Sequence, residues 1–146
     1  MRWNVLLIPM SFFMAFQTMA RADMWVGDGI DSDLGPMVRV VIFENSYGSK
    51  NVGLTFPSSE CRSYEQDVQQ APSYQINGIE VQTYAQCIGA GVRLDFPATP
   101  AGMRYVIEQF HSQQQVAYSQ DGVTVTFNTY GFRHAYLNYG MSMQVI

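Results

Sequence analysis

The sequence predicts a single small α+β domain with an antiparallel sheet of about six strands, two short helices on one face and one disulfide. Three observations support this. Alternating segments flank an Asn-Gly and an Asp-Gly pair, an amphipathic segment follows a Thr-Pro pair, and two cysteines follow a leader of the secretory type. The 146 residues, 47% hydrophobic and 14% charged, suffice for one core and exclude a disordered chain.

Residues 1–22 are expected to be a secretory signal peptide. Arg2 precedes an apolar stretch over 5–16, and Ala20-Arg21-Ala22 has the A-x-A form of a cleavage site. The alternative, a transmembrane anchor, needs about 20 apolar residues, and this stretch is shorter. We therefore expect a periplasmic or secreted protein that begins at Asp23 and does not insert into the membrane after cleavage.

Cys61 and Cys87 are expected to form the disulfide. Export places both cysteines in an oxidising compartment, where a disulfide is the usual state of such a pair. The alternative is a redox or nucleophilic thiol. The sequence has no C-x-x-C pair and each cysteine has an obvious mate, so we interpret the pair as structural.

The first strands are predicted from their β-branched residues. Residues 23–36 are rich in Gly and Asp without periodicity, so we expect an extended acidic arm that precedes a domain over 37–146. Residues 37–43 are apolar on both faces apart from one arginine, which predicts a central strand. Residues 52–56 predict a second short strand.

A β-hairpin is predicted around Asn77-Gly78. Both central positions of a type I′ turn need a positive φ, which Asn and Gly adopt most readily. The residues on either side alternate between apolar and polar. The turn therefore predicts two cross-strand pairs that share one apolar face, Ile76 with Ile79 and Tyr74 with Val81.

A similar turn at Asp121-Gly122 predicts a second hairpin between 116–118 and 123–127. Its likeness to the first hairpin leaves open an internal duplication. Between the two hairpins, residues 91–96 alternate and predict a half-buried strand. Its inward side chains would be Val92, Leu94 and Phe96, and its outward side chains Arg93 and Asp95.

Two helices are predicted in the C-terminal half. Thr99 can cap a helix that starts at Pro100, and apolar residues recur at helical spacing over 100–111. Three aromatic residues at helical spacing predict a second, short helix over 132–139.

No motif identifies a reaction or a ligand. The sequence has no G-x-S-x-G, P-loop or G-x-G-x-x-G pattern, so we expect no catalytic residue and no cofactor. His111 and His134 are the two histidines, and surface roles near helix ends suit them better than a metal site. Paired carboxylates leave a small secreted hydrolase as the second alternative.

The charge balance excludes nucleic acid as a partner. The chain has 8 Lys and Arg against 12 Asp and Glu, a net charge of −4. A protein that tracks phosphates needs clustered basic residues, and here they are scattered. We therefore expect another protein as the partner, and an acidic chain attracts a basic one.

Tyrosine is the residue type that indicates a function. Several tyrosines are not required in the core by the predicted strands and helices, and Tyr is favoured at protein interfaces. The alternative is that they only cover an apolar body.

We expect a non-catalytic protein-binding module, an inhibitor or immunity-type protein of a bacterial envelope. A structural or assembly component of a surface or secretion apparatus is the first alternative. The candidate binding residues are Tyr47, Tyr64, Tyr84, Tyr130 and Tyr139.

Overall fold

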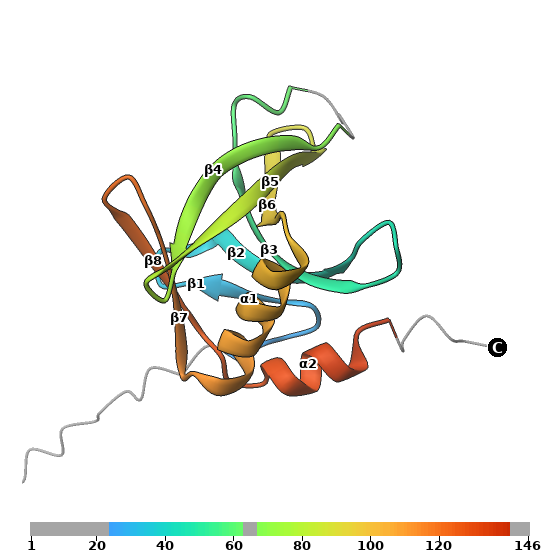
Figure 1. The fold of residues 1–146 in the computed structure, drawn as a ribbon, viewed down its shortest axis with the longest axis vertical. Coiled ribbons are helices and arrows are strands. Elements are labelled where there is room, and N and C mark those ends of the chain that lie inside the picture. Colours follow the sequence, from blue (N-terminus) through green and yellow to red (C-terminus); the bar gives the residue numbers. More distant parts are fainter. Residues whose placement is uncertain (1–23, 63–66, 141–146) are drawn as a thin grey trace, which may run out of the picture.

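The computed structural model describes residues 24–62 and 67–140, which form one antiparallel sheet and two helices (Figure 1). The strands are β1 (Gly29–Ser32), β2 (Gly35–Glu44), β3 (Lys50–Pro57), β4 (Gln69–Ile76), β5 (Ile79–Gly89), β6 (Val92–Pro97), β7 (Gln115–Gln120) and β8 (Val123–Asn128). The helices are α1 (Pro100–Ser112) and α2 (Phe132–Asn138). The predicted small antiparallel domain with two helices is confirmed, but this part of the chain has eight strands rather than about six.

The sheet is nearly closed into a barrel. Its strand order is β1-β2-β3-β6-β5-β4-β7-β8, and every neighbouring pair is antiparallel. The two outermost strands meet, because the amide of Asp33, just after β1, donates to the carbonyl of Thr126 on β8 at 3.0 Å. Closure of this kind removes exposed sheet edges, which otherwise invite aggregation.

The core lies between the curved sheet and the two helices. Val40 on β2, Val52 on β3 and Val106 on α1 are fully buried together. The helices contact each other through Phe110 and Phe132, whose ring centroids are 5.1 Å apart. The apolar face of α1 therefore packs where the predicted amphipathic pattern places it. Neither helix of the described residues is long and apolar enough to cross a bilayer.

The segment expected as an extended acidic arm is part of the barrel from Met24 onward. Trp25 is 4% exposed and packs edge-on against Phe110 and Phe132. Strand β1 pairs with β2, and Asp31 accepts a 2.6 Å hydrogen bond from Arg39. The prediction missed this strand because it spans only four residues and its buried positions do not alternate, so no periodicity marks it.

The first hairpin has the predicted turn and register. Asn77 and Gly78 both have a positive φ, at 47° and 84°, and Ile76 lies opposite Ile79. Ile79 is nevertheless 55% exposed, whereas Ile76 is 1% exposed, because β7 flanks Ile76 while the pairing of β5 with β6 ends at Thr83. The second hairpin repeats the turn at Asp121-Gly122.

The assignment of inward and outward residues in β6 was wrong. Val92 is exposed, whereas Asp95 is 2% exposed and faces the barrel interior. Burial of a charge needs partners, and here Arg93 and Tyr74 both donate hydrogen bonds to the carboxylate. Leu94 is buried on the opposite, outer face.

The predicted start of the first long helix and the predicted disulfide agree with the structure. Helix α1 begins at Pro100, and the Thr99 hydroxyl accepts from the Gly102 amide at 3.0 Å. Cys61 and Cys87 form the disulfide. The predicted signal peptide lies outside the described residues.

Candidate functional site

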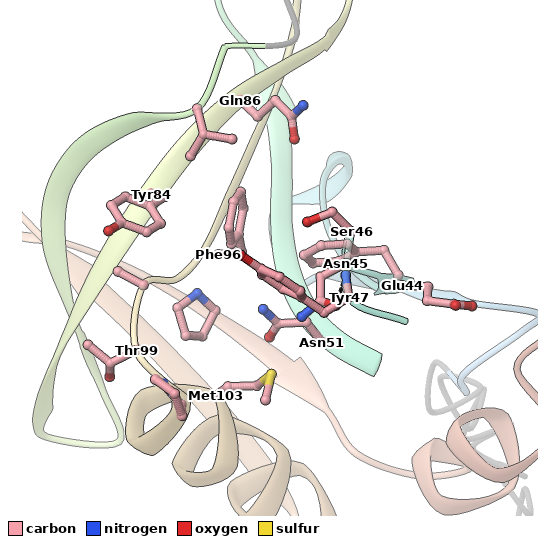
Figure 2. A pocket seen from close by; sticks show the side chains of 15 residues that line it. Glu44, Asn45, Ser46, Tyr47, Asn51, Tyr84, Gln86, Phe96, Thr99 and Met103 are labelled. Atoms are coloured by element: carbon pink, nitrogen blue, oxygen red, sulfur yellow. Dashed lines mark hydrogen bonds between the residues drawn. The ribbon is translucent and has the colours of Figure 1, made fainter. Parts of the chain in front are cut away.

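A groove with a volume of about 740 Å³ lies on the outer face of the sheet (Figure 2). We call it the outer groove. Its floor comes from strands β2, β3, β5 and β6, one wall from the loop over 45–49, and the other from the start of α1. Its lining residues are Phe43, Glu44, Asn45, Ser46, Tyr47, Asn51, Val68, Tyr84, Gln86, Phe96, Pro97, Ala98, Thr99, Pro100 and Met103.

Three aromatic rings from three different strands form the floor. The ring centroid of Phe96 lies 5.5 Å from that of Phe43 and 6.1 Å from that of Tyr84. Adjacent rings meet at 69° and 68°, the edge-to-face arrangement that aromatic pairs prefer. The register explains the row, because Tyr84 on β5 lies directly opposite Phe96 on β6.

Gly53 on β3 makes room for this row. A Cβ atom at Gly53 would lie 2.5 Å from Leu94 Cδ1 and 3.0 Å from Phe43 Cε1. Only a residue without a side chain lets these two neighbours meet above the strand. The glycine therefore allows Phe43 and Leu94 to pack together on the outer face.

The loop wall is held in shape by its own hydrogen bonds. The Asn45 side-chain oxygen accepts from the amides of Tyr47 at 3.0 Å and Ser49 at 2.9 Å. Gly48 has a φ of 78°, which the turn requires. Tyr47 is 92% exposed at the tip of this ordered loop. The loop thus holds the ring in solvent in an ordered conformation. An ordered loop loses little conformational entropy when a ligand binds.

The other wall is the segment from Pro97 to Met103. Gly102 lies close to β5, because a Cβ atom there would lie 3.2 Å from Val81 Cγ1. This close approach explains a glycine in the first turn of a helix, where it otherwise costs about 1 kcal/mol. Figure 2 shows Met103 and Thr99 at the edge of the groove opposite the 45–49 loop.

Three polar side chains at the rim accept backbone hydrogen bonds from this chain. Asn45 accepts two, Asn51 accepts one from the Val52 amide at 2.8 Å, and Thr99 accepts one from Gly102. None of the lining residues is Lys or Arg. The outer groove is thus an aromatic surface edged by polar side chains.

Glu44 is the one carboxylate among the lining residues. Lys50 lies directly opposite it in the β2–β3 register. Its Nζ atom instead donates to the carbonyl of Tyr136 at 2.6 Å and lies 4.8 Å from the centroid of that ring. Within the described part of the chain, Glu44 therefore has no ion-pair partner.

The structure brings two of the five candidate tyrosines together. Tyr47 and Tyr84 both line the outer groove. Tyr130 is 67% exposed but lies elsewhere, and Tyr139 is half buried beside a separate hollow near α2. Tyr64 lies outside the described residues.

Sequence reasoning missed Phe43, Phe96 and Met103 as groove residues. The prediction placed Phe96 and Met103 in the core by their spacing. The signal for Phe43 was present, because residues 37–43 are apolar on both faces and a strand in a one-sided sheet needs only one apolar face.

The two histidines lie in different surroundings. His134 is exposed on α2, as expected. His111 differs from the expected surface role, because its ring packs between Phe132 and Tyr136 at centroid distances of 4.9 Å and 5.3 Å. Its Nδ1 atom is buried without a hydrogen-bond partner among the described residues.

Tyr74, Arg93 and Asp95 form a largely buried cluster in the barrel interior. Burial, followed by the hydrogen bond to Asp95, raises the pKa of Tyr74 above its ordinary range. Burial lowers the pKa of Arg93, but its bonds to Asp95 outweigh this and raise it. These groups bond one another, so the cluster serves the fold. The described residues contain no group of three or more His, Cys, Asp and Glu that could hold a metal ion.

The fold and the groove define a small, disulfide-bonded antiparallel sheet, nearly closed into a barrel, with an aromatic groove on its outside. Comparison with known proteins adds no relative, since no family model matches the chain and no curated protein or solved structure is significantly similar to it.

Proposed function

We propose that this chain is an exported, non-catalytic protein that binds another protein through the outer groove. One observation carries the proposal. Tyr47 and Tyr84, which come from separate parts of the sequence, lie on one groove and are 92% and 40% exposed. Exposed aromatic rings gathered on one surface are typical of protein interfaces.

Pre-organisation supports this role. The rings of Phe43 and Phe96 pack edge-on against each other, and hydrogen bonds to Asn45 fix the loop that carries Tyr47. A surface that is ordered before binding loses little conformational entropy when a partner docks. Binding energy can then come from the buried rings.

The disulfide and the predicted leader support a location outside the cytoplasm. The Cys61–Cys87 bond fits a protein outside the cytoplasm. With residues 1–22 as its signal peptide, the chain would act in the periplasm or as a secreted protein. An inhibitor or immunity-type role suits a rigid domain with a net charge of −4 that meets a more basic partner.

A capture experiment followed by a titration tests the proposal. The exported protein is immobilised, partners are taken from an extract of its own cell envelope, and the captured protein is purified and titrated. We expect Tyr84→Ala and Tyr47→Ala to weaken its binding by about tenfold, because truncating a Tyr buried at an interface costs 1 kcal/mol or more. Tyr130→Ala is the matched control, an exposed tyrosine outside the groove. If only Tyr130→Ala weakens binding, the groove is not the interface.

A further inference from the structure

We infer that the outer groove recognises an extended, uncharged peptide segment of its partner. The side-chain amide of Asn51 donates to a backbone carbonyl of that segment, and an apolar side chain of the segment lies on the aromatic floor. This inference rests on the proposed function, because it names the part of the partner that occupies the same groove. A buried hydrogen-bond donor without an acceptor carries it.

Asn51 is a buried polar residue of the outer groove. It lies on β3 directly opposite Phe43 on β2, so both side chains lie on the outer face of the sheet. Only 3% of Asn51 is exposed. In Figure 2 it lies between the side chain of Met103 and the 45–49 loop. A polar side chain enclosed to this degree is costly unless its polar atoms find partners.

The amide of Asn51 uses its oxygen within the chain but not its nitrogen. Oδ1 accepts from the Val52 amide at 2.8 Å, and this bond fixes which end is the oxygen, since Nδ2 cannot accept. Nδ2 has no acceptor among the described residues. It is not sealed inside the protein, because His111 Nδ1 is the one fully enclosed polar side-chain atom without a partner in that part of the chain. The nitrogen therefore opens onto the groove, where only solvent accepts from it before a ligand binds.

Asn45 repeats this arrangement in the loop wall. Both backbone bonds that it accepts use its oxygen, so its NH2 group also has no acceptor within the described part of the chain. Glu44, the one carboxylate among the lining residues, also lines the separate hollow beside α2, and none of the lining residues is basic. The groove thus offers neutral amide donors. They suit a neutral acceptor, because a charged ligand group would lose its hydration without meeting an opposite charge.

An extended peptide brings an acceptor and an apolar group at the spacing of this site. Asn51 and Phe43 lie directly opposite each other, and the Cβ atoms of such a pair are about 4.5 to 5.5 Å apart. Consecutive residues of an extended segment advance about 3.3 Å, so a side chain and a neighbouring carbonyl are separated by a similar distance. One apolar side chain can therefore lie on the rings of Phe43 and Phe96 while that carbonyl accepts from Asn51.

The rim and the size of the groove suit the rest of a short segment. The hydroxyl groups of Ser46, Tyr47 and Tyr84 can accept as well as donate, so they can meet the N–H groups that a peptide also brings. A volume of about 740 Å³ lies within the roughly 300 to 1,000 Å³ of sites that enclose drug-sized ligands, which is room for a few residues. Adjacent rings of the floor meet at 69° and 68°, so they share no flat face on which a sugar ring could lie.

An NMR titration of the isotopically labelled exported protein tests the inference with three defined probes. They are the capped peptides acetyl-Ala-Leu-Ala-amide and acetyl-Ala-Glu-Ala-amide, and cellohexaose. We expect the Leu peptide to shift the side-chain NH2 signals of Asn51 together with the backbone amide of Phe96. It should bind at least about threefold more tightly than the Glu peptide, because an uncharged groove does not compensate a buried carboxylate. A Leu peptide that shifts Phe96 and leaves the NH2 signals of Asn51 unchanged overturns the role of Asn51.

Asn51→Asp isolates the donor. The variant keeps the oxygen that accepts from Val52 and replaces the NH2 group with a second oxygen, which faces the ligand carbonyl as another acceptor. We expect it to weaken the Leu peptide by at least about tenfold. Asn138→Asp is the matched control, the same change at an exposed asparagine on α2, and should stay within about twofold.

Urea unfolding checks that both variants fold. A folded Asn51→Asp that binds the Leu peptide as tightly as the unchanged protein overturns the inference. If Asn51→Asp does not fold, the NH2 signals of Asn51 in the unchanged protein decide the question, because that measurement needs no variant.

The remaining outcomes separate this inference from the proposed function. If cellohexaose shifts the Asn51 signals and the peptides do not, the groove is a sugar site and the inference is wrong. If no probe binds while Tyr84→Ala still weakens the captured partner, the segment chemistry is wrong and the protein-binding function stands. If the captured partner is unaffected by both Tyr47→Ala and Tyr84→Ala, the proposed function itself fails.

Discussion

Tyr74 on β4 donates a hydrogen bond to Asp95 on β6, with 2.6 Å between Oη and Oδ2, although β5 lies between the two strands in the sheet. The curvature of the barrel brings the two side chains together across its interior. Arg93 donates two further bonds to the same carboxylate, at 2.7 Å and 3.1 Å. A buried charge is therefore satisfied by three donors.

Replacing Tyr74 with Phe should destabilise the protein by about 1.5 to 3 kcal/mol, because it removes one hydrogen bond to a charged, buried acceptor. Equilibrium unfolding in urea measures the change. Tyr84→Phe is the control, since it removes a hydroxyl from a tyrosine that is 40% exposed, and should stay within about 0.5 kcal/mol. Equal losses in the two variants would mean that the bond to Asp95 contributes nothing.

His111 predicts a pH dependence. Burial, and then the nearby charge of Arg133, lower the pKa of His111, while Glu108 acts in the opposite direction. Lys50 lies over the ring of Tyr136, which packs against His111, so a further positive charge is near the histidine. The unfolded chain, with an ordinary histidine pKa of about 6.5, therefore takes up its proton before the folded one does.

Stability should accordingly be full above pH 6.5 and decrease as the pH falls below it. Urea unfolding at a series of pH values between about 8 and 5 measures this decrease. His111→Gln should flatten the profile over that window, while His134→Gln, on the exposed side of α2, should leave it unchanged. A profile that His111→Gln does not alter would assign the pH dependence to other groups.

Removing the disulfide should cost about 2 to 5 kcal/mol, the usual loss for a small exported domain. The double variant Cys61→Ser, Cys87→Ser tests this in urea unfolding. Thiol titration of the untreated protein is the companion measurement, because the bonded pair predicts no titratable thiol until a reductant is added. Two free thiols in the native exported protein would contradict the bond.

Gly78→Ala should destabilise the first hairpin by about 1 to 2 kcal/mol, the cost of a left-handed conformation with a side chain. A Cβ atom at Gly78 would meet nothing within 4 Å, so the loss reflects backbone strain alone. Gly89→Ala provides a matched control. It also has open space and lacks a positive φ, and should change stability by less than about 0.5 kcal/mol. Similar losses at both positions would rule out strain as the cause.

The sequence predicted those elements whose signals lie within a few residues. The Asn77-Gly78 turn fixes its register through the φ angles of two residues, and Thr99-Pro100 starts α1 through a cap and a fixed φ. The Cys61–Cys87 pair needed only a count of cysteines and an expected compartment.

Barrel closure and the outer groove were decided by the tertiary structure alone. The contact of Asp33 with Thr126 joins residues about ninety positions apart, and local periodicity carries no information on such a pairing. Asp95 looked like an outward residue because a lone carboxylate is costly to bury, and only the fold shows the donors from Tyr74 and Arg93 that offset this cost. Likewise, the sequence indicated only that several tyrosines are not required in the core by the predicted strands and helices. Only the packing of β5 beside β6 and the turn of the 45–49 loop place Tyr84 and Tyr47 on the same groove, because an exposed side chain is positioned by the strands beneath it.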